Sequence, residues 1–426
     1  MKAVILAGGR GTRLGALTEK LPKPLIPLAG LATIEHQLML LKRYGVDEVF
    51  ILSGYLAGEI SCAIGDGVPF GLHVEHVIEK EPLGTAGAIA QLDGRLTEDF
   101  IVLYGDVMMD MDLRRLMDFH LAKKSVCTPV LHPNDHPQDS DLVETDAGRR
   151  IVAVHPKPHQ PGVWYKNLAN TGVYAFSPEI FKFIEHGVKQ DFAKNILPRV
   201  SQKGLAYGYV TPEYIKDMGT PERLAKVEKD FMGGVVAGRN LQRKRKAVFL
   251  DRDGVINRER GLVSRPEDFE LLPGAAKAVR DINRLGFLAV VVTNQPVIAR
   301  NMCTLETLET IHRKMETLLG AEGAYLDAVY FCPHHPDKGY PEENPDYKTD
   351  CACRKPKTGM IDSAVKDLNI ELKGSYLVGD SQRDIDCAKN AGLTAILVGG
   401  GKVRGADLSC ADLPAAVGLI AQREHK

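Results

Sequence analysis

The chain has almost no net charge and no long apolar run, and these two absences limit the kinds of partner that it can bind. Lys and Arg number 54 against 55 Asp and Glu, so no overall field attracts nucleic acid or an anionic membrane. No segment approaches the roughly 18 apolar residues of a membrane-spanning helix. The apolar start, residues 3–7, is too short for a secretory leader. We therefore expect a cytoplasmic protein that binds neither nucleic acid nor membrane.

Tryptophan and cysteine are also scarce, with one and eight residues in a chain of 426. Six of the cysteines lie in the second half: Cys303, Cys332, Cys351, Cys353, Cys387 and Cys410. In a reducing compartment, clustered cysteines indicate a metal site before a disulfide. The length suits two domains of ordinary size, and without a repeat of about 20–50 residues the chain is not a solenoid.

The first half begins with a predicted buried strand, residues 1–7, followed directly by a glycine-rich turn, residues 8–14. Such a turn leaves backbone N–H groups free to surround phosphates. Arg10 and Arg13 add charged donors, and Lys23 stands between two prolines. The turn lacks the GK[ST] of a P-loop and the spacing of a dinucleotide fold. A phosphate-binding turn of another kind is the remaining interpretation.

Strand and helix patterns alternate through the first half. We expect helices at residues 33–44, 54–64 and 221–232 and strands at residues 48–53, 72–78 and 101–104. This alternation predicts an α/β fold with a mostly parallel, Rossmann-like sheet. Ligands of such sheets bind beyond the carboxyl ends of the strands. Both the glycine turn and Asp106 follow a predicted strand end.

Six motifs in the first half come in the order seen in sugar-1-phosphate nucleotidyltransferases. They are LAGGRGTRL, PKP, EKEPLGTAGA, YGD, NTGVY and KDMGTPE. The first half resembles that family, and it is particularly similar to guanylyltransferases acting on D-glycero-α-D-manno-heptose 1-phosphate and to those acting on mannose 1-phosphate. The resemblance implies a GT-A-like nucleotidyltransferase domain over residues 1–232.

The resemblance also implies a role for each motif. Arg13 and Lys23 would neutralise charge as pyrophosphate leaves, and Asp106 and Asp217 would hold Mg²⁺, whose preferred ligands are hard oxygens. The residues implied around the nucleotide are Leu6, Ala7, Gly8, Gly9, Gly11, Thr12, Pro82, Gly84, Thr85 and Gly105. No covalent intermediate is required, because positioning and charge neutralisation carry the rate.

The sugar side of this site departs from the family pattern. The family has Glu-Lys-Pro where this chain has Pro156-Lys157-Pro158. Lys157 keeps its implied role at the sugar phosphate, whereas the replaced glutamate leaves sugar specificity open. Asn170 and Asp191 are candidates for sugar contacts or for capping. Trp164 either stacks on a sugar or packs in the fold, and we favour packing.

A segment with little periodicity, residues 233–245, separates the two halves. We predict that it is a linker, and that its basic run, residues 239–246, is solvated. The second domain then covers residues 246–426. It begins with a predicted strand, residues 247–250, that ends in Asp251 and Asp253. Charges at the end of a buried strand need a metal, a cation or water as partner.

Further polar motifs follow the predicted strands of the second half: Thr293-Asn294-Gln295, Arg354-Lys355-Pro356 and Gly379-Asp380-Ser381. In this order they resemble the haloacid-dehalogenase (HAD) phosphatases. The resemblance implies Asp251 as nucleophile, Asp253 as acid and base, and Thr293 and Lys355 as stabilisers of the phosphoryl oxygens. It places Mg²⁺ on Asp251, on the backbone carbonyl of Asp253 and on Asp380. The substrate contacts expected across both halves are Lys157, Asn170, Asn294 and Arg354.

Cys332, His334, Cys351 and Cys353 form a CxH…CxC set. Four such ligands in two close pairs suit tetrahedral Zn²⁺, with His335 as the alternative to His334. All four positions are filled by protein, so the ion would be structural. It would fix the loop at residues 336–350, which has little to pack against.

With DRDGVIN, TNQ, CPHHPD and CRKPKTGM, the second half closely resembles D-glycero-D-manno-heptose 1,7-bisphosphate 7-phosphatases and, less closely, histidinol-phosphate phosphatases. The two resemblances together imply a bifunctional enzyme. It would remove the 7-phosphate and then use GTP to make GDP-heptose for a lipopolysaccharide or S-layer glycan. Guanine rests on resemblance, and no HxGH motif of the adenylyl branch occurs. The alternative pair of substrates is mannose 1-phosphate and histidinol phosphate. A non-catalytic sensor is disfavoured by the intact charged motifs, and the oligomeric state stays open.

Overall fold

The computed structural model describes residues 1–337, 339 and 343–424. Residues 338, 340–342 and 425–426 lie outside the described residues, and with them part of the predicted loop at 336–350. The chain divides into two compact units. Unit 1 comprises residues 1–132, 140–157 and 168–241, and unit 2 comprises residues 133–139, 158–167 and 242–426. Among the described residues, no helix is long and apolar enough to cross a membrane.

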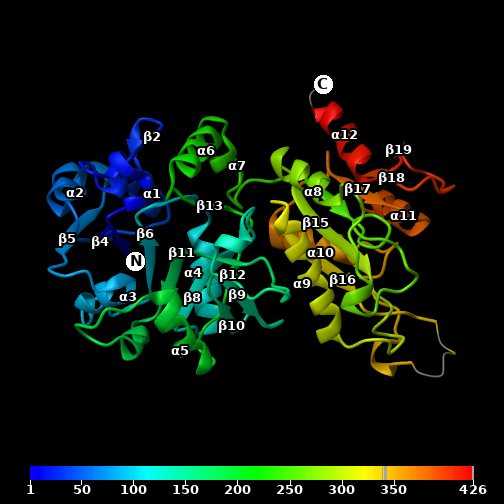
Figure 1. The fold of residues 1–426 in the computed structure, drawn as a ribbon, viewed down its shortest axis with the longest axis horizontal. Coiled ribbons are helices and arrows are strands. Elements are labelled where there is room, and N and C mark those ends of the chain that lie inside the picture. Colours follow the sequence, from blue (N-terminus) through cyan, green and yellow to red (C-terminus); the bar gives the residue numbers. More distant parts are fainter. Residues whose placement is uncertain (338, 340–342, 425–426) are drawn as a thin grey trace. The chain divides into compact units, whose positions relative to one another are not determined.

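A nine-stranded sheet forms the centre of unit 1 (Figure 1). Its order is β10-β9-β11-β6-β1-β4-β5, with β8 paired to β11 and β12 paired to β8. The strands are β1 (Lys2–Leu6), β4 (Glu48–Ser53), β5 (His73–Ile78), β6 (Phe100–Tyr104), β8 (Cys127–His132), β9 (Leu142–Thr145), β10 (Ile151–His155), β11 (Ala169–Phe176) and β12 (Tyr209–Val210). Two short pairs lie apart from it: β2 (Pro27–Leu28) with β3 (Leu31–Ala32), and β7 (Val107–Asp110) with β13 (Tyr214–Asp217).

Helices cover both faces of this sheet. They are α1 (Thr33–Arg43), α2 (Ala57–Ile64), α3 (Gly84–Ile89), α4 (Leu113–Lys123) and α5 (Leu197–Gln202), whereas α6 (Pro221–Met232) and α7 (Val235–Gly238) pack on the β7–β13 pair. Successive residues of a strand face opposite sides. In β1, Ala3 and Ile5 join the core beneath α1, α2 and α4, whereas Val4 joins the core beneath α3 and α5. A strand covered on both faces is apolar throughout, which explains why β1 was recognisable.

The sheet is parallel in one half and mostly antiparallel in the other, where β12 pairs in parallel with β8. β1 pairs in parallel with β4 and β6, and β4 pairs in parallel with β5. These are the strands that the sequence predicted. β11 is antiparallel to β6, β8 and β9. This half was not predicted, because the pairing direction of a buried strand leaves no mark on its apolar pattern.

The basic run at residues 239–246 is packed at its start rather than solvated. Arg239, Asn240 and Leu241 are all buried. Asn240 Nδ2 donates to Asp110 Oδ1 at 2.7 Å, and the Leu241 backbone N–H donates to Glu213 Oε1 at 2.8 Å. The prediction of a solvated run is therefore wrong for these residues, because buried carboxylates need donors and the run supplies them.

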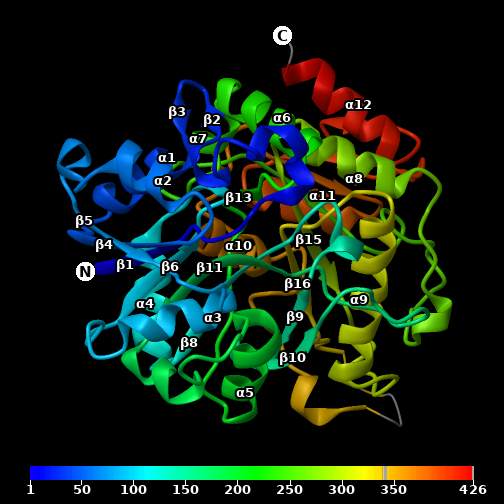
Figure 2. The ribbon, with the colours of Figure 1, turned by 60° about the vertical axis from the view of Figure 1, so that its left-hand side comes forward.

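Unit 2 contains a six-stranded parallel sheet of order β16-β15-β14-β17-β18-β19. The strands are β14 (Ala247–Leu250), β15 (Leu288–Asn294), β16 (Ala328–Cys332), β17 (Tyr376–Gly379), β18 (Thr394–Leu397) and β19 (Leu408–Ser409). The helices are α8 (Ala275–Arg284), α9 (Leu305–Ala321), α10 (Gly359–Leu368), α11 (Gln382–Asn390) and α12 (Leu413–Glu424). Val248 and Leu250 pack with α8, α9 and α12 on one face of the sheet, and Ala247 and Phe249 pack with α10 and α11 on the other. Figures 1 and 2 show these helices around the strands of unit 2.

Unit 2 also includes two segments that precede it in the sequence, residues 133–139 and 158–167. The second segment packs on α9. The Thr317 hydroxyl accepts from the Tyr165 backbone N–H at 2.8 Å and donates to the Tyr165 carbonyl at 3.1 Å. Lys314 Nζ lies 5.2 Å from the centroid of the Trp164 ring. These contacts favour the packing role for Trp164.

Candidate active sites

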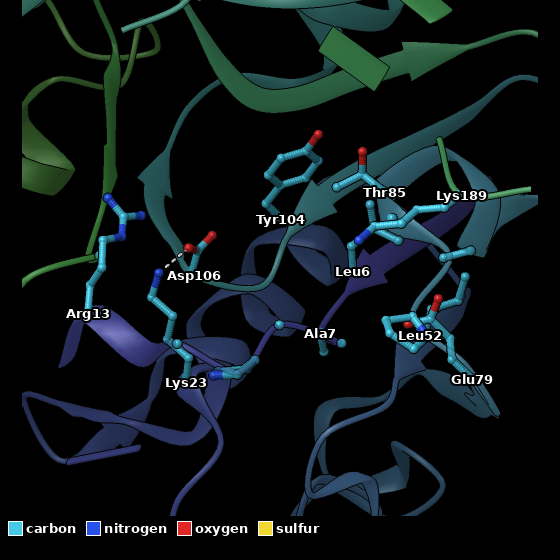
Figure 3. Close-up of a pocket in the computed structure, with 18 residues that line it drawn as sticks. Leu6, Ala7, Arg13, Lys23, Leu52, Glu79, Thr85, Tyr104, Asp106 and Lys189 are labelled. Carbon is cyan, nitrogen blue, oxygen red and sulfur yellow. Dashed lines mark hydrogen bonds and ion pairs between the residues drawn. The ribbon is translucent and has the colours of Figure 1, made fainter. Parts of the chain in front are cut away.

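A cavity of about 390 Å³ lies in unit 1 where β1, β4, β5 and β6 end (Figure 3). Eleven of the residues that line it were expected at the nucleotide or the phosphates: Leu6, Ala7, Gly8, Gly9, Gly11, Arg13, Lys23, Pro82, Gly84, Thr85 and Asp106. Parallel strands place their carboxyl ends at one edge, so residues from distant motifs meet here. Thr12 begins the short 3-10 helix Thr12–Thr18 that follows the glycine turn.

Two positions in the cavity wall must be glycine, because neighbouring atoms lie too close to leave room for a Cβ. A Cβ on Gly8 would lie 2.4 Å from Glu79 Oε2. Gly84 has a φ of +72°, and a Cβ there would lie 2.5 Å from the Gln190 carbonyl oxygen. Both distances are shorter than any van der Waals contact. The glycine turn and the Gly84 turn therefore cannot carry side chains without rebuilding the cavity wall.

Lys23 and Asp106 form an ion pair at one side of the cavity (Figure 3). Lys23 is 7% exposed, so its ammonium is held in place rather than moving freely in water. Arg13 reaches the same wall, since a Cβ on Gly219 would lie 2.9 Å from Arg13 Nη2. Charges in a partly closed cavity interact more strongly than in water. This side of the cavity can therefore neutralise the charge on phosphates.

Asp217 lies at the end of β13 and does not line the cavity itself. Both of its carboxylate oxygens accept from Arg223 Nη1 at 2.9 Å. Burial opposes ionisation of Asp217, but Arg223 beside it holds the pKa of that carboxyl below its usual value. In this conformation both implied magnesium ligands of unit 1, Asp106 and Asp217, are paired with cationic side chains.

The expected sugar contacts lie away from the cavity lining. Asn170 Nδ2 donates to Tyr174 Oη at 2.8 Å, and the Lys157 backbone N–H donates to Asp141 Oδ1 at 3.2 Å. Asp191 Oδ1 accepts from the Ala193 backbone N–H at 3.0 Å and so caps the turn Phe192–Ile196. Of the two roles left open for Asp191, the structure shows capping. Gly105 donates its backbone N–H to the Leu6 carbonyl at 2.9 Å and supports the cavity from behind.

Seven further residues line the cavity without a predicted role: Pro24, Leu52, Glu79, Ala88, Tyr104, Lys189 and Gly219. Five of them, Pro24, Glu79, Ala88, Tyr104 and Gly219, belong to the recognised motifs. The motifs therefore indicated that these residues lie near the site, but they did not indicate what each residue does. Leu52 and Lys189 carried no signal. Glu79 stands out because its Oε1 is buried without a hydrogen-bond partner among the described residues. Burial raises the pKa of Glu79.

In unit 2, three acids and a lysine converge at the ends of β14 and β17. Lys355 Nζ lies 2.9 Å from Asp251 Oδ1 and 2.6 Å from Asp384 Oδ1. Carboxylate oxygens of Asp251, Asp380 and Asp384 lie within 4.8 Å of one another. Burial and the neighbouring Asp384 raise the pKa of Asp251, and burial followed by Asp384 raises the pKa of Asp380 to about 6. Asp384, which the sequence left without a role, completes this cluster.

The acidic cluster fits a divalent cation. Gly254 has a φ of +77°, and a Cβ there would lie 2.0 Å from Asp380 Oδ2, so glycine is needed beside this carboxylate. Burial, and after it the neighbouring Asp384, raises the pKa of Asp251 and of Asp380, and a bound cation would favour the ionised forms of both. The carboxylates could therefore hold a metal ion of the kind that prefers oxygen.

Asp253 is held apart from this cluster by donors. Its carboxylate accepts from Arg252 Nη2 at 3.0 Å, from Gln295 Nε2 at 2.8 Å and from Asn257 Nδ2 at 2.9 Å. Arg252 is fully buried and also reaches His312 Nε2 at 3.4 Å. Although burial acts in the other direction, Arg252 holds the pKa of Asp253 below its usual value. Arg252 and Gln295 had no predicted role.

Two implied substrate residues of unit 2 have structural contacts. Asn294 Nδ2 donates to the Lys355 carbonyl at 3.1 Å, and Asn294 Oδ1 accepts from the Lys355 backbone N–H at 3.0 Å. Asn294 thus positions Lys355. Arg354 Nη1 donates to the His334 carbonyl at 3.1 Å. Thr293 is buried, and its hydroxyl accepts from Gln295 Nε2 at 2.9 Å.

The four predicted zinc ligands come together in unit 2. Cys353 Sγ lies 3.1 Å from Cys332 Sγ, 3.2 Å from Cys351 Sγ and 3.4 Å from His334 Nδ1. These separations suit four atoms around one tetrahedral ion. His335, the alternative, instead directs its Nδ1 at the Asp337 backbone N–H at 3.2 Å. The set could therefore hold a metal through His334.

Comparison with known proteins identifies the first half. The model of the family described as nucleotidyl transferase matches residues 2–232, more than half of the chain. The chain belongs to the nucleotidyl transferase family. A mannose-1-phosphate guanylyltransferase of Mycobacterium tuberculosis is 35% identical over 236 residues, which cover 55% of this chain and 65% of that protein. This nucleotidyl transferase thus spans slightly less than two thirds of the length of that relative.

The second half of this nucleotidyl transferase matches a HAD-hydrolase-like family over residues 352–418. The D-glycero-beta-D-manno-heptose-1,7-bisphosphate 7-phosphatase of Haemophilus ducreyi is 42% identical over 160 residues, 37% of this chain and 85% of that protein. The enzyme of the same name from Yersinia pestis is 40% identical over 181 residues, 40% of this chain and 94% of that protein. The second half belongs to the family of these phosphatases. Both family resemblances are confirmed: the chain joins a domain of the nucleotidyl transferase family to a domain of the phosphatase family.

Proposed function

We propose that this chain is a cytoplasmic bifunctional enzyme that carries out two consecutive steps. Residues 246–426 would remove the 7-phosphate of D-glycero-D-manno-heptose 1,7-bisphosphate, and residues 1–232 would transfer GMP from GTP to heptose 1-phosphate. The observation that carries the proposal is that one chain holds both the cluster around Asp251 and the cavity around Lys23 and Asp106. The product of hydrolysis, a sugar 1-phosphate, is the kind of substrate that the first half needs.

In the phosphatase step, the Asp251 carboxylate attacks phosphorus and forms an aspartyl-phosphate while the bond to the C7 oxygen breaks. Asp253 gives its proton to that oxygen and then takes one from the water that releases phosphate. Because Arg252 favours the ionised form of Asp253, Asp253 must loosen its contact with Arg252 to act as an acid. Lys355 and Thr293 would hold the phosphoryl oxygens.

Asp251, Asp380 and the backbone carbonyl of Asp253 would hold Mg²⁺, which when bound supplies positive charge against the phosphoryl oxygens. The Asp253 carboxylate is engaged by Arg252, Gln295 and Asn257, which supports the choice of its carbonyl. Asp384 would keep Lys355 in place through their 2.6 Å ion pair. Arg354 would meet the substrate at the mouth of this site.

In the nucleotidyltransferase step, a phosphate oxygen of the sugar attacks the α-phosphorus of GTP, and the bond to pyrophosphate breaks. Arg13 and Lys23 would neutralise the charge that builds on the leaving pyrophosphate. Asp106 and Asp217 would hold a second Mg²⁺ after giving up their present partners, Lys23 and Arg223. Lys157 is proposed at the sugar phosphate and Asn170 at the sugar.

Product analysis tests this function. Heptose 1,7-bisphosphate, Mg²⁺ and an equal mixture of the common nucleoside triphosphates would be given to the full-length protein, and the products identified by mass spectrometry. We expect phosphate, pyrophosphate and GDP-heptose in equal amounts. Faster turnover of CTP, UTP, dTTP or ATP than of GTP would contradict the guanine assignment.

A second candidate substrate for the first half is mannose 1-phosphate. It is suggested by the mycobacterial relative, which is named a mannose-1-phosphate guanylyltransferase. The two are separated by comparing kcat/KM for heptose 1-phosphate and mannose 1-phosphate with GTP fixed. A preference for mannose 1-phosphate would indicate that the second half also acts on another phosphomonoester. Histidinol phosphate would then be the first substrate to assay.

We propose a structural zinc ion at Cys332, His334, Cys351 and Cys353. The full-length protein should contain about one zinc ion per chain, as measured by inductively coupled plasma mass spectrometry. The Cys353→Ser variant should lose most of this zinc. A loss of about 2 kcal/mol would lower the melting temperature of a domain of this size by about 4–8 °C. Cys410→Ser, outside the cluster, is the matched control and should keep both. Zinc-free wild-type protein with an unchanged melting temperature would contradict the proposal.

A further inference from the structure

A series of polar contacts leads from the Asp253 carboxylate into the interior of unit 2. Arg252 is fully buried, and its Nη2 donates to Asp253 Oδ2 and to Gln295 Oε1, each at 3.0 Å. Its Nη1 instead faces His312 Nε2 at 3.4 Å. Because arginine has five N–H donors and no acceptor, His312 accepts in this contact and is therefore neutral. The guanidinium is thus held from two sides, by the acid of the proposed reaction and by His312.

His312 belongs to a row of three residues on one face of α9. Glu309, His312 and Glu316 are spaced by three and four residues, which places them one above another on a helix. His312 is buried, and its ring centroid lies 5.5 Å from that of Phe331. Burial, and after it the charge of Arg252, holds the pKa of His312 well below its usual value. This agrees with an imidazole that accepts from an arginine.

A segment from the first half of the sequence contacts this face of α9. The segment lies between β10 and β11 in the sequence but belongs to unit 2. The Asn167 backbone N–H donates to Glu316 Oε2 at 2.8 Å, and Lys166 Nζ lies 3.2 Å from Glu309 Oε1. Along the helix, His312 lies between these two contacts. The segment therefore holds the part of α9 that carries His312.

We infer that His312 is a positioning residue of the phosphatase, which holds the Arg252 guanidinium so that Arg252 in turn aims the Asp253 carboxylate at the leaving oxygen. Residues 164–167 support it by fixing this part of α9. The inference rests on the proposed phosphatase mechanism, in which Asp253 gives its proton to that oxygen.

The loss of His312 would leave a buried Nη1 donor of Arg252 without its acceptor, which is unfavourable. The guanidinium would turn toward another acceptor and carry the Asp253 carboxylate with it. General acid catalysis depends on the distance and direction of the proton donor, so the protonation of the leaving oxygen would become slower. When Asp253 loosens its contact to act as the acid, His312 keeps the guanidinium from following it.

The decisive test compares two leaving groups in the full-length protein. A sugar alkoxide needs a proton as it leaves, whereas p-nitrophenolate leaves without one and does not depend on the acid. We expect His312→Leu to lower kcat for heptose 1,7-bisphosphate by about 10- to 100-fold, the effect of a misplaced acid. KM for this substrate and the turnover of p-nitrophenyl phosphate should be unchanged. His312→Gln keeps an acceptor and should recover most of the lost rate.

Thr317→Val tests the supporting segment. The Thr317 hydroxyl bonds both polar backbone groups of Tyr165, so its removal should lower the same kcat by a smaller factor and leave p-nitrophenyl phosphate turnover unchanged. Thr310→Val is the matched control, since the Thr310 hydroxyl donates within α9 to the Glu306 carbonyl at 2.9 Å. It should change neither rate. A Thr317→Val variant that behaves like this control would overturn the role of the segment.

Two results for His312→Leu would overturn the inference. An unchanged kcat for the sugar bisphosphate would show that His312 does not position the acid, and equal losses with both esters would show a purely structural role. Wild-type protein that does not hydrolyse heptose 1,7-bisphosphate would overturn the proposed function instead. The comparison of leaving groups would then use histidinol phosphate, which also leaves as an alkoxide, so the two failures are distinguishable.

Discussion

Asp251→Asn is expected to lower phosphate release from heptose 1,7-bisphosphate by about 10³-fold or more, while pyrophosphate formation from heptose 1-phosphate and GTP stays unchanged. The reason is that the amide cannot act as the attacking oxygen, although it fills the same space beside Lys355. The measurement is the release of phosphate and of pyrophosphate from the same preparation, each under saturating substrate.

Asp386→Asn is the control for this variant. Asp386 lies on α11 close to Asp384 in the sequence, but it is exposed and accepts from Gln382 at the surface. It should keep both activities. Loss of both activities in Asp251→Asn would contradict independent sites, and full phosphate release would contradict the role of Asp251 as nucleophile.

Lys23→Met is expected to lower kcat for pyrophosphate formation by about 10²- to 10³-fold, the usual effect of removing one preorganised charged donor. The structure explains why a single lysine matters this much. Lys23 is buried, is held between two prolines and lines the cavity beside Asp106. Methionine keeps most of the side-chain volume and removes the charge. Pyrophosphate is measured with GTP and heptose 1-phosphate, and phosphate release should be unchanged.

Lys20→Met tests whether any nearby cation would serve. Lys20 shortly precedes Lys23 in the sequence and is exposed, so its loss should leave both activities within about twofold, as expected for an exposed residue away from the site. Equal effects of the two substitutions would point to general electrostatic attraction of the nucleotide instead of a positioned charge at Lys23.

The sites were predictable where a motif follows a buried strand. β1 and β14 are covered on both faces and are therefore apolar throughout, and the polar residues after them mark the strand ends. Gly8 and Asp106 in unit 1 could be placed at one edge for this reason, whereas the role of Lys23 came from its motif. The ordered motifs of unit 2 led in the same way to the cluster around Asp251.

Other features depended on contacts between residues far apart in the sequence. The burial of Asn240 and Leu241 depends on Asp110 and Glu213, which lie in other elements. Asn294 was expected to meet the substrate, yet its side chain holds the backbone of Lys355. No local pattern distinguishes such a residue from one that faces a ligand.

The sequence by itself determined the two families, and it predicted the strand ends proposed to carry their chemistry and the four residues proposed to bind zinc, because these depend on residue type and order along the chain. Only the tertiary structure decided the antiparallel pairings of the first sheet, the donors that hold Asp253, and the position of Glu79, whose Oε1 is buried without a hydrogen-bond partner among the described residues. Each of these features depends on which groups, distant in the sequence, come into contact after folding and which groups remain without a partner. Local hydrophobic periodicity does not predict such contacts.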